Sequence, residues 1–161
     1  MLWNVYFRKG TVLIPTVAKT EAGFYLDINP VDAVHVTDAQ AIRSAITRAV
    51  STGNPTIPTP TRAAFPKPVV LSYVNVKSWY AFEREAECWE IVIEKDVYQI
   101  KTMRKSSSKG WEDDPEILET IPAKNGVEVV AQRVCELLQS ASSRSTAHTK
   151  KKVFPSSEIS K

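Results

Sequence analysis

With 161 residues, the chain is long enough for one domain with its own hydrophobic core and too short for two full-sized domains. Hydrophobic residues make up 43% and charged residues 24%, as in ordinary soluble globular proteins, and no apolar run approaches the roughly 18 residues that a membrane span needs. The net charge of +3 belongs to the C-terminal end: residues 141–161 carry five basic side chains and one acidic, whereas residues 1–140 carry 16 and 17 and lack the basic excess of nucleic-acid-binding domains.

The first 36 residues predict a meander of short antiparallel strands. Trp3, Val5 and Phe7 alternate with other side chains at the period of two that a half-buried strand requires. Pro15 predicts an edge position or a bulge in the second strand, and Asn29-Pro30 predicts a turn between the third and the fourth. The four expected strands cover residues 3–8, 11–18, 24–28 and 31–36.

A helix is expected next, with signals at both ends. Thr37 and Gln40 have the spacing of a capping box, in which each side chain satisfies a backbone amide of the first turn. Apolar residues recur at helical spacing over residues 42–50, and Gly53 follows where a left-handed residue commonly ends a helix.

Residues 54–68 hold five of the ten prolines. Each proline fixes φ near −65°, removes a backbone donor and biases the preceding residue toward extended geometry. Neither a helix nor a central strand passes through such a segment, so we expect a stiff, extended connector. Long ordered loops often carry binding residues, which makes this segment the first place to look for function.

The second half predicts further strands and helices. Residues 69–76 form an apolar run expected to be a strand, and Ser78 can cap a short helical turn. Residues 88–94 and 97–104 predict a hairpin that turns at Lys95-Asp96.

The C-terminal third predicts two more helices. Asp114-Pro115-Glu116 has the pattern of a helix start, and Pro122 would end that helix early. Asn125 and Glu128 form a second capping box, at the start of a last helix that reaches about Ala141. A mobile loop is expected at residues 105–110.

Taken together, the pattern predicts an α+β fold. It would have a mostly antiparallel sheet, made of an N-terminal four-strand meander plus a later strand and hairpin, with two main helices packed on one face. Residues 1–140 would form a single domain, and residues 141–161 a disordered basic tail rich in Ser, Thr and Lys.

The sequence offers no set of catalytic residues, no metal site and no cofactor motif. His35, with Asp27 on the preceding expected strand, is the one candidate general base, although a half-exposed histidine without a task is the favoured interpretation. The acidic clusters at residues 83–87 and 112–114 are expected to be solvated or to cap helices. Cys88 and Cys135 are expected to be lone buried thiols, which suits a cytoplasmic protein, and the N-terminus lacks the pattern of a signal peptide.

The connector and the residues after it are the best candidates for a binding surface. Trp, Tyr and Arg often dominate the binding energy of protein interfaces, and a proline-stiffened loop loses less entropy when it binds. A core role for the aromatic residues stays open as the alternative. The candidate partner-binding residues are Arg62, Phe65, Lys67, Trp79 and Tyr80.

Three functions remain. The first is a non-enzymatic module that covers a partner protein, in one form a bacterial toxin-neutralising immunity protein. The second is nucleic-acid binding through strand aromatics such as Tyr6 and Tyr98 together with the basic tail. The third is a small-ligand protein or an enzyme with a site near His35. No membrane association is expected, and the oligomeric state is left open.

Overall fold

The computed structural model describes residues 1–105 and 111–150, with side chains described at residues 1–103, 111 and 119–144. The strands are β1 (Leu2–Arg8), β2 (Thr11–Thr20), β3 (Tyr25–His35), β4 (Thr56–Ile57), β5 (Ala86–Glu94), β6 (Val97–Lys105) and β7 (Trp111–Pro122). The helices are α1 (Ala39–Thr52), α2 (Trp79–Glu85) and α3 (Val127–Lys150), with 3-10 turns η1 (Arg62–Ala64), η2 (Val69–Val74) and η3 (Ala123–Asn125).

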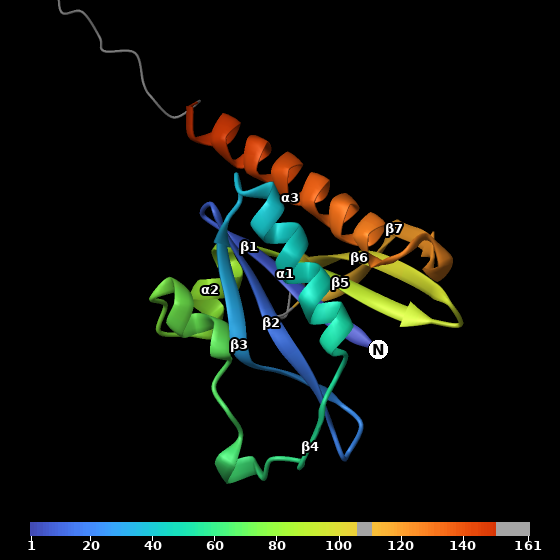
Figure 1. Ribbon diagram of the computed structural model, residues 1–161. Helices are drawn as coiled ribbons and strands as arrows, with labels where there is room; N and C mark the ends of the chain where they lie inside the picture. Colours follow the sequence, from blue (N-terminus) through green and yellow to red (C-terminus); the bar gives the residue numbers. More distant parts are fainter. Residues whose placement is uncertain (106–110, 151–161) are drawn as a thin grey trace, which may run out of the picture.

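One sheet organises the molecule, with its strands in the order β3-β2-β1-β5-β6-β7 (Figure 1). Every neighbouring pair along this path is antiparallel, and the two-residue strand β4 pairs in parallel with the end of β2. The predicted α+β fold with a mostly antiparallel sheet is therefore confirmed.

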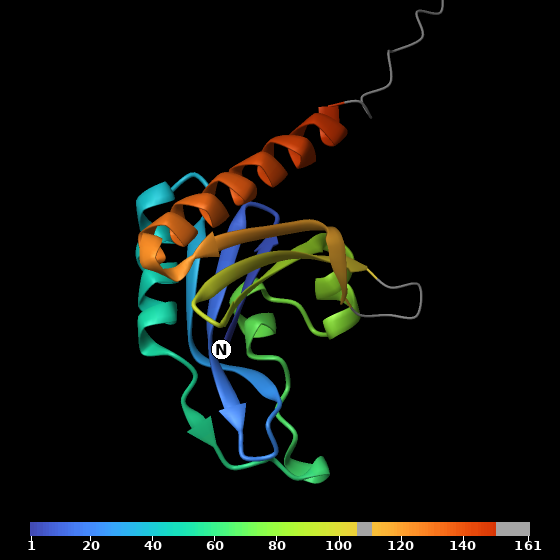
Figure 2. The same ribbon diagram turned by 90° about the vertical axis from the view of Figure 1, so that its right-hand side faces the viewer.

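Helices α1 and α3 lie side by side over one face of the sheet, as both views show (Figures 1 and 2). The alternation in β1 directs Trp3, Val5 and Phe7 to this face, where they pack against Ile46 of α1 and Leu138 of α3. We call this side the helix face. Its aromatic and aliphatic side chains are almost fully buried, so most of the hydrophobic stabilisation of the fold originates here.

The opposite face of the sheet has a thinner cover. Tyr6 of β1 and Leu13 of β2 point to it and pack against Phe82 of α2 and the buried Val70 and Leu71 of η2. We call this side the pocket face. Ser78 caps α2 as predicted, because its Oγ accepts a hydrogen bond from the amide of Ala81.

The N-terminal meander has three strands, not four. The predicted turn at Asn29-Pro30 is wrong, because β3 continues through both residues. Ladder pairing links Thr16 to Ile28 and then Pro15 to Val31, so Asn29 and Pro30 form an irregularity within an edge strand, where a proline is tolerated. The bulge predicted at Pro15 is confirmed at the same place.

The expected helix is confirmed as α1, but its N-cap lies one residue later than predicted. Its N-cap is Asp38, whose carboxylate accepts a hydrogen bond from the amide of Ala41, so the capping box at Thr37 is wrong. Asp is as good a cap as Thr, and one residue separates the two alternatives. Gly53 ends the helix with φ of 73°, as predicted.

Two segments predicted as regular elements adopt other structures. The run at residues 69–76, expected to be a strand, forms η2, which buries its apolar side chains by lying across the pocket face. The helix predicted from Asp114 is wrong, because residues 111–122 form β7. Pairing to β6 is interrupted between Asp114 and Glu119, and this irregularity in an edge strand accommodates Pro115.

The hairpin of β5 and β6 is confirmed, and α3 extends past its expected end. Ala141, placed at the start of a disordered tail, is fully buried, and the helix continues to Lys150. Of the loop predicted at residues 105–110, Lys105 is the last residue of β6, and residues 106–110 lie outside the described residues, as does the rest of the tail, 151–161. Among the helices in the described ranges, none is long and apolar enough to cross a membrane.

Candidate functional site

The connector, residues 54–68, begins where β1 and β2 separate. These strands pair only from Tyr6↔Leu13 to Arg8↔Thr11 and diverge beyond it. The side chain of Asn54 fills the opening: its Oδ1 accepts from the amide of Leu2, and its Nδ2 donates to the carbonyls of Leu2 and Val17. One amide side chain thus replaces the missing ladder bonds between the two strands.

The connector is then fastened to the turn between β2 and β3. The amides of Lys19 and Glu21 donate to the carbonyls of Pro55 and Ile57, at 2.9 and 3.0 Å. The amide of Ala22 donates to Oγ1 of Thr59 at 2.8 Å. The predicted stiff connector is therefore also held by backbone hydrogen bonds, and both views show η1 and the β2–β3 turn projecting at the same end of the molecule (Figures 1 and 2).

Two aromatic rings meet at this end. Phe65 of the connector lies over Phe24 of the turn, with ring centroids 6.3 Å apart and 22° between the ring planes. The two residues are 55% and 39% exposed, respectively. We call this pair the aromatic tip. An exposed pair of stacked apolar rings is what a protein partner could cover with a gain in hydrophobic free energy.

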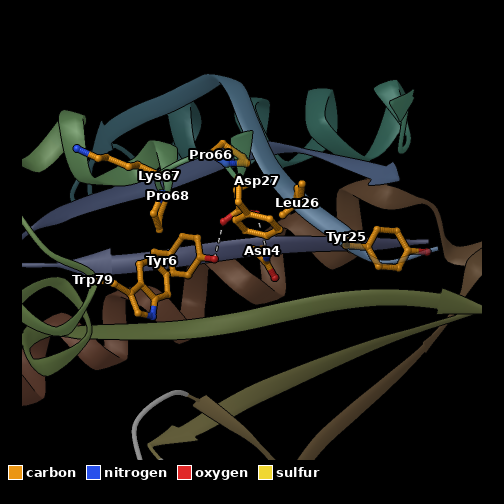
Figure 3. A pocket seen from close by; sticks show the side chains of 10 residues that line it. Asn4, Tyr6, Tyr25, Leu26, Asp27, Pro66, Lys67, Pro68 and Trp79 are labelled. Carbon is orange, nitrogen blue, oxygen red and sulfur yellow. Dashed lines mark hydrogen bonds between the residues drawn. The ribbon is translucent and has the colours of Figure 1, made fainter. Parts of the chain in front are cut away.

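Beside the tip, a pocket of about 240 Å³ lies between the connector and the sheet (Figure 3). Asn4 and Tyr6 line it from β1, residues 25–27 from β3, residues 65–68 from the connector and Trp79 from α2. We call it the connector pocket. Its walls are largely aromatic and proline rings, with a small number of polar groups on the sheet side.

Asp27 is the central polar group of the connector pocket. Its Oδ2 accepts a hydrogen bond from the Tyr6 hydroxyl at 2.6 Å, and its Oδ1 accepts one from Nδ2 of Asn4 at 2.8 Å. Burial raises the pKa of Asp27, although both hydrogen bonds act in the opposite direction. Burial, followed by the charge of Asp27, raises the pKa of Tyr6 well above its usual value, so Tyr6 remains a hydroxyl donor at neutral pH.

A cluster of rings holds Tyr6 in place. Trp79, Phe82 and Trp111 surround it with centroids 6.2, 5.6 and 5.7 Å away, and the first two meet it edge to face. Trp79 and Phe82 also stack on each other at 5.3 Å. These ring contacts fix the position of the Tyr6 hydroxyl independently of its hydrogen bond to Asp27.

The structure divides the five predicted partner-binding residues. Phe65, Lys67 and Trp79 line the connector pocket, so the connector and the start of α2 meet there. Arg62 is exposed on η1, and Tyr80 is 60% exposed on α2; neither lines the pocket. Trp79 combines both readings of the sequence, since it packs in the ring cluster and still borders the pocket.

Sequence reasoning missed Asn4, Tyr6 and Asp27 as a site. Asn4 and Tyr6 alternate with the apolar residues of β1, a signal that both point to the same face. Their meeting with Asp27 depends on β1 and β2 separating beyond the pair Tyr6↔Leu13, so that side chains of β1 reach β3, and no local pattern shows this separation.

The structure places His35 away from the connector pocket. His35 is exposed at the end of β3, and its Nδ1 lies 2.8 Å from Oγ1 of Thr37. The ladder partners of the two residues on β2, Thr11 and Val17, are six residues apart, so His35 and Asp27 lie about 20 Å apart along the sheet at 3.3–3.4 Å per residue. The structure therefore does not bring together the predicted pair of His35 and Asp27.

The strand aromatics proposed for nucleic-acid stacking are buried. Tyr6 is 4% exposed beneath α2, and Tyr98 is 9% exposed on the helix face. Neither ring presents a face to solvent for a base. Cys88 and Cys135 are free, buried thiols, as expected, and Glu83 is buried where a solvated side chain was predicted.

Comparisons with known proteins bear on the fold alone. No protein-family model matches the chain, and neither does any curated protein. Among solved structures, the chain resembles a protein of unknown function from Neisseria meningitidis. The TM-score is 0.59 at 11% sequence identity, and the match covers 83% of this chain and 92% of that one. The shared feature is the arrangement of helices and strands.

Proposed function

We propose that this protein is a non-enzymatic protein-binding module that acts by covering a partner protein. The observation that carries the proposal is the aromatic tip, two stacked rings that stay exposed at the end of a fastened connector. Arg62 and Lys67 lie within three residues of Phe65 and are exposed too, which gives the surface the mixture of rings and cations common at protein interfaces.

The way the connector is held supports tight binding. A loop whose backbone becomes ordered on binding loses roughly 1–2 kcal/mol of conformational entropy for each residue that is fixed. Here, prolines restrict the backbone, and the hydrogen bonds from Lys19, Glu21 and Ala22 hold it before any partner arrives. The connector therefore loses less conformational entropy when a partner binds.

One specific form of this function is a bacterial toxin-neutralising immunity protein that works in the cytoplasm. Such a protein needs only a rigid, exposed surface with which to cover the working site of a toxin. An adjacent gene for a large secreted protein with a variable end would supply the candidate partner. We expect co-expression of this chain to protect cells from that partner, and Phe65→Ala to weaken the protection.

The proposal is tested by affinity capture from the source cell with the full chain. We expect the wild-type protein to retain a defined partner and Phe65→Ala to lose most of it. Val129→Ala is the matched control, because Val129 is 44% exposed on α3, away from the tip. A partner retained equally by Phe65→Ala, Phe24→Ala and the control would contradict the proposal.

Nucleic-acid binding is the competing outcome. A salt titration with single-stranded and duplex oligonucleotides separates it, because binding through phosphates weakens steeply as salt rises. Strong binding at low salt that Phe65→Ala leaves unchanged would favour that function over protein binding.

A further inference from the structure

The carboxylate of Asp27 has unused hydrogen-bonding capacity in the connector pocket. An ionised carboxylate offers about four acceptor positions. The hydroxyl of Tyr6 takes one on Oδ2, and the amide of Asn4 takes one on Oδ1. One position therefore remains on each oxygen, a pattern that suits two parallel N–H donors.

No cation of the described part of the chain neutralises this carboxylate. Among the described side chains, no lysine, arginine or histidine forms an ion pair with Asp27. Lys67 lines the pocket, but its side chain extends away from Asp27 (Figure 3). Lys19 lies over the ring of Tyr25, with its Nζ 6.0 Å from the centroid.

A partly buried carboxylate without a cation lowers the stability of the fold, since desolvation penalises its charge. A cation that enters the pocket would offset this cost. The aromatic walls favour the same occupant, because the faces of Trp, Tyr and Phe rings attract cations. Both observations indicate a positively charged guest of planar, two-pronged shape.

We propose that the connector pocket receives one arginine side chain of the partner protein, whose guanidinium pairs with Asp27 between the rings of Trp79 and Phe65. This inference rests on the proposed function and names the chemistry of one contact. Arginine fits better than lysine, because its planar fork donates two parallel hydrogen bonds and stacks on aromatic rings, whereas an ammonium is a compact, strongly hydrated charge.

The size of the pocket agrees with a side chain as occupant. Sites for small molecules and cofactors typically measure about 300–1,000 Å³. The connector pocket, at about 240 Å³, lies below that range. It borders the aromatic tip through Phe65, so one partner could cover the tip and insert a side chain beside it.

The test uses the full chain and a blocked arginine, Nα-acetyl-arginine methylamide, followed by NMR. We expect saturable shifts of the Asn4 side-chain amide and the Trp79 indole. The citrulline counterpart has the same shape without the charge, and we expect it to bind about tenfold more weakly, since charge-assisted hydrogen bonds are about twice as strong as neutral ones.

Asp27→Asn should remove the preference for arginine over citrulline, while Asp32→Asn, on the same strand and outside the pocket, should retain it. Equal binding of the two compounds, or no shift at Asn4 and Trp79 up to the solubility limit, would overturn the inference. The citrulline comparison stands on wild-type protein alone, so it holds even where a variant fails to fold.

The two proposals fail separately. If the tip variants lose the partner but arginine does not bind, only the arginine contact is wrong. If arginine binds and the tip variants retain the partner, the pocket is real and the proposed surface is wrong.

Discussion

At the scale of single residues, Asn54 shows how one side chain can complete a sheet. It supplies both a donor and an acceptor to Leu2 and a donor to Val17, across the gap where β1 and β2 separate. These backbone groups are partly buried, so without Asn54 they would lose their partners without regaining full contact with water.

We therefore expect Asn54→Ala to lower the free energy of unfolding by about 1–3 kcal/mol, the cost of unsatisfied buried polar groups. Urea denaturation would measure the loss. Thr52→Ala is the control, because Thr52 is exposed and its Oγ1 donates to the carbonyl of Arg48 within the same helix, so its loss should stay within about 0.5 kcal/mol. Equal effects of the two substitutions would contradict the bridging role.

Asp27 and Glu119 should affect stability in opposite directions as pH changes. Burial raises the pKa of Asp27 above its ordinary 3.8, so the folded state holds the proton more tightly than the unfolded state. The free energy of unfolding should then fall as pH rises from 3.8 through the raised pKa. We expect the stability of Asp27→Asn relative to wild type to increase over that window.

Glu119 provides the contrasting case. Hydrogen bonds from Arg133, at 2.6 and 2.7 Å, lower its pKa below the ordinary 4.5. Its contribution to stability is complete above pH 4.5 and is lost as pH falls through the lowered value. The difference between wild type and Glu119→Gln should therefore shrink on acidification. Parallel pH profiles for the two variants would show that these assignments are wrong.

At the scale of elements, two hairpins of the same type differ in their turn residues. Lys9 and Gly10 have φ of 47° and 83°, and Lys95 and Asp96 have φ of 48° and 60°. Positive φ at both central residues favours glycine at the second position. Gly10 meets this preference, and Asp96 does not.

We expect Asp96→Gly to raise the free energy of unfolding by about 0.5 kcal/mol, the relief of a left-handed residue less the entropy that glycine loses. Gly10→Ala should lower it by about 1–2 kcal/mol, because φ of 83° is a left-handed backbone that penalises a residue with a Cβ, whereas the new Cβ itself would make only an ordinary contact with the ring of His35. Thermal melts would show both. A stabilising Gly10→Ala would contradict this account of the turns.

Local sequence patterns correctly predicted the caps and turns that do not depend on which strands pair with each other. Ser78 capped α2, Lys95-Asp96 turned the hairpin, and Gly53 ended α1. Proline was interpreted wrongly where pairing decides the outcome. Pro30 and Pro115 have the local patterns of a turn and a helix start, yet each lies in an irregularity of an edge strand, and a sequence does not show which strands form the edges.

At the scale of the whole molecule, the sheet separates two layers that serve different purposes. The helix face carries the extended core under α1 and α3, and the pocket face carries the ring cluster that supports Tyr6. The sequence predicted the helix layer, because its apolar stripes are long. On the pocket face it indicated the connector and α2 but not Asn4, Tyr6 and Asp27, which meet because β1 and β2 separate.

Substitutions in the two layers should separate stability from binding. Leu138→Ala should cost about 2–5 kcal/mol and leave the arginine-induced shift of the Trp79 indole unchanged. Phe82→Ala should cost about 3–5 kcal/mol and also weaken that shift, because Phe82 packs on both Tyr6 and Trp79. Denaturation and NMR titration of the same samples would test the separation. Equal loss of the shift in both would contradict it.

The two cysteines occupy opposite sides of the sheet, Cys88 among the pocket-face residues and Cys135 among those of the helix face. They cannot join in a disulfide while the sheet stands between them, and burial raises the pKa of both thiols. The alkylation rate of each thiol therefore reports how often its own side of the sheet opens to solvent. Alkylation of Cys88 should quicken when Phe82 is truncated, and that of Cys135 when Leu138 is, so mass spectrometry of labelled peptides would time the opening of each side.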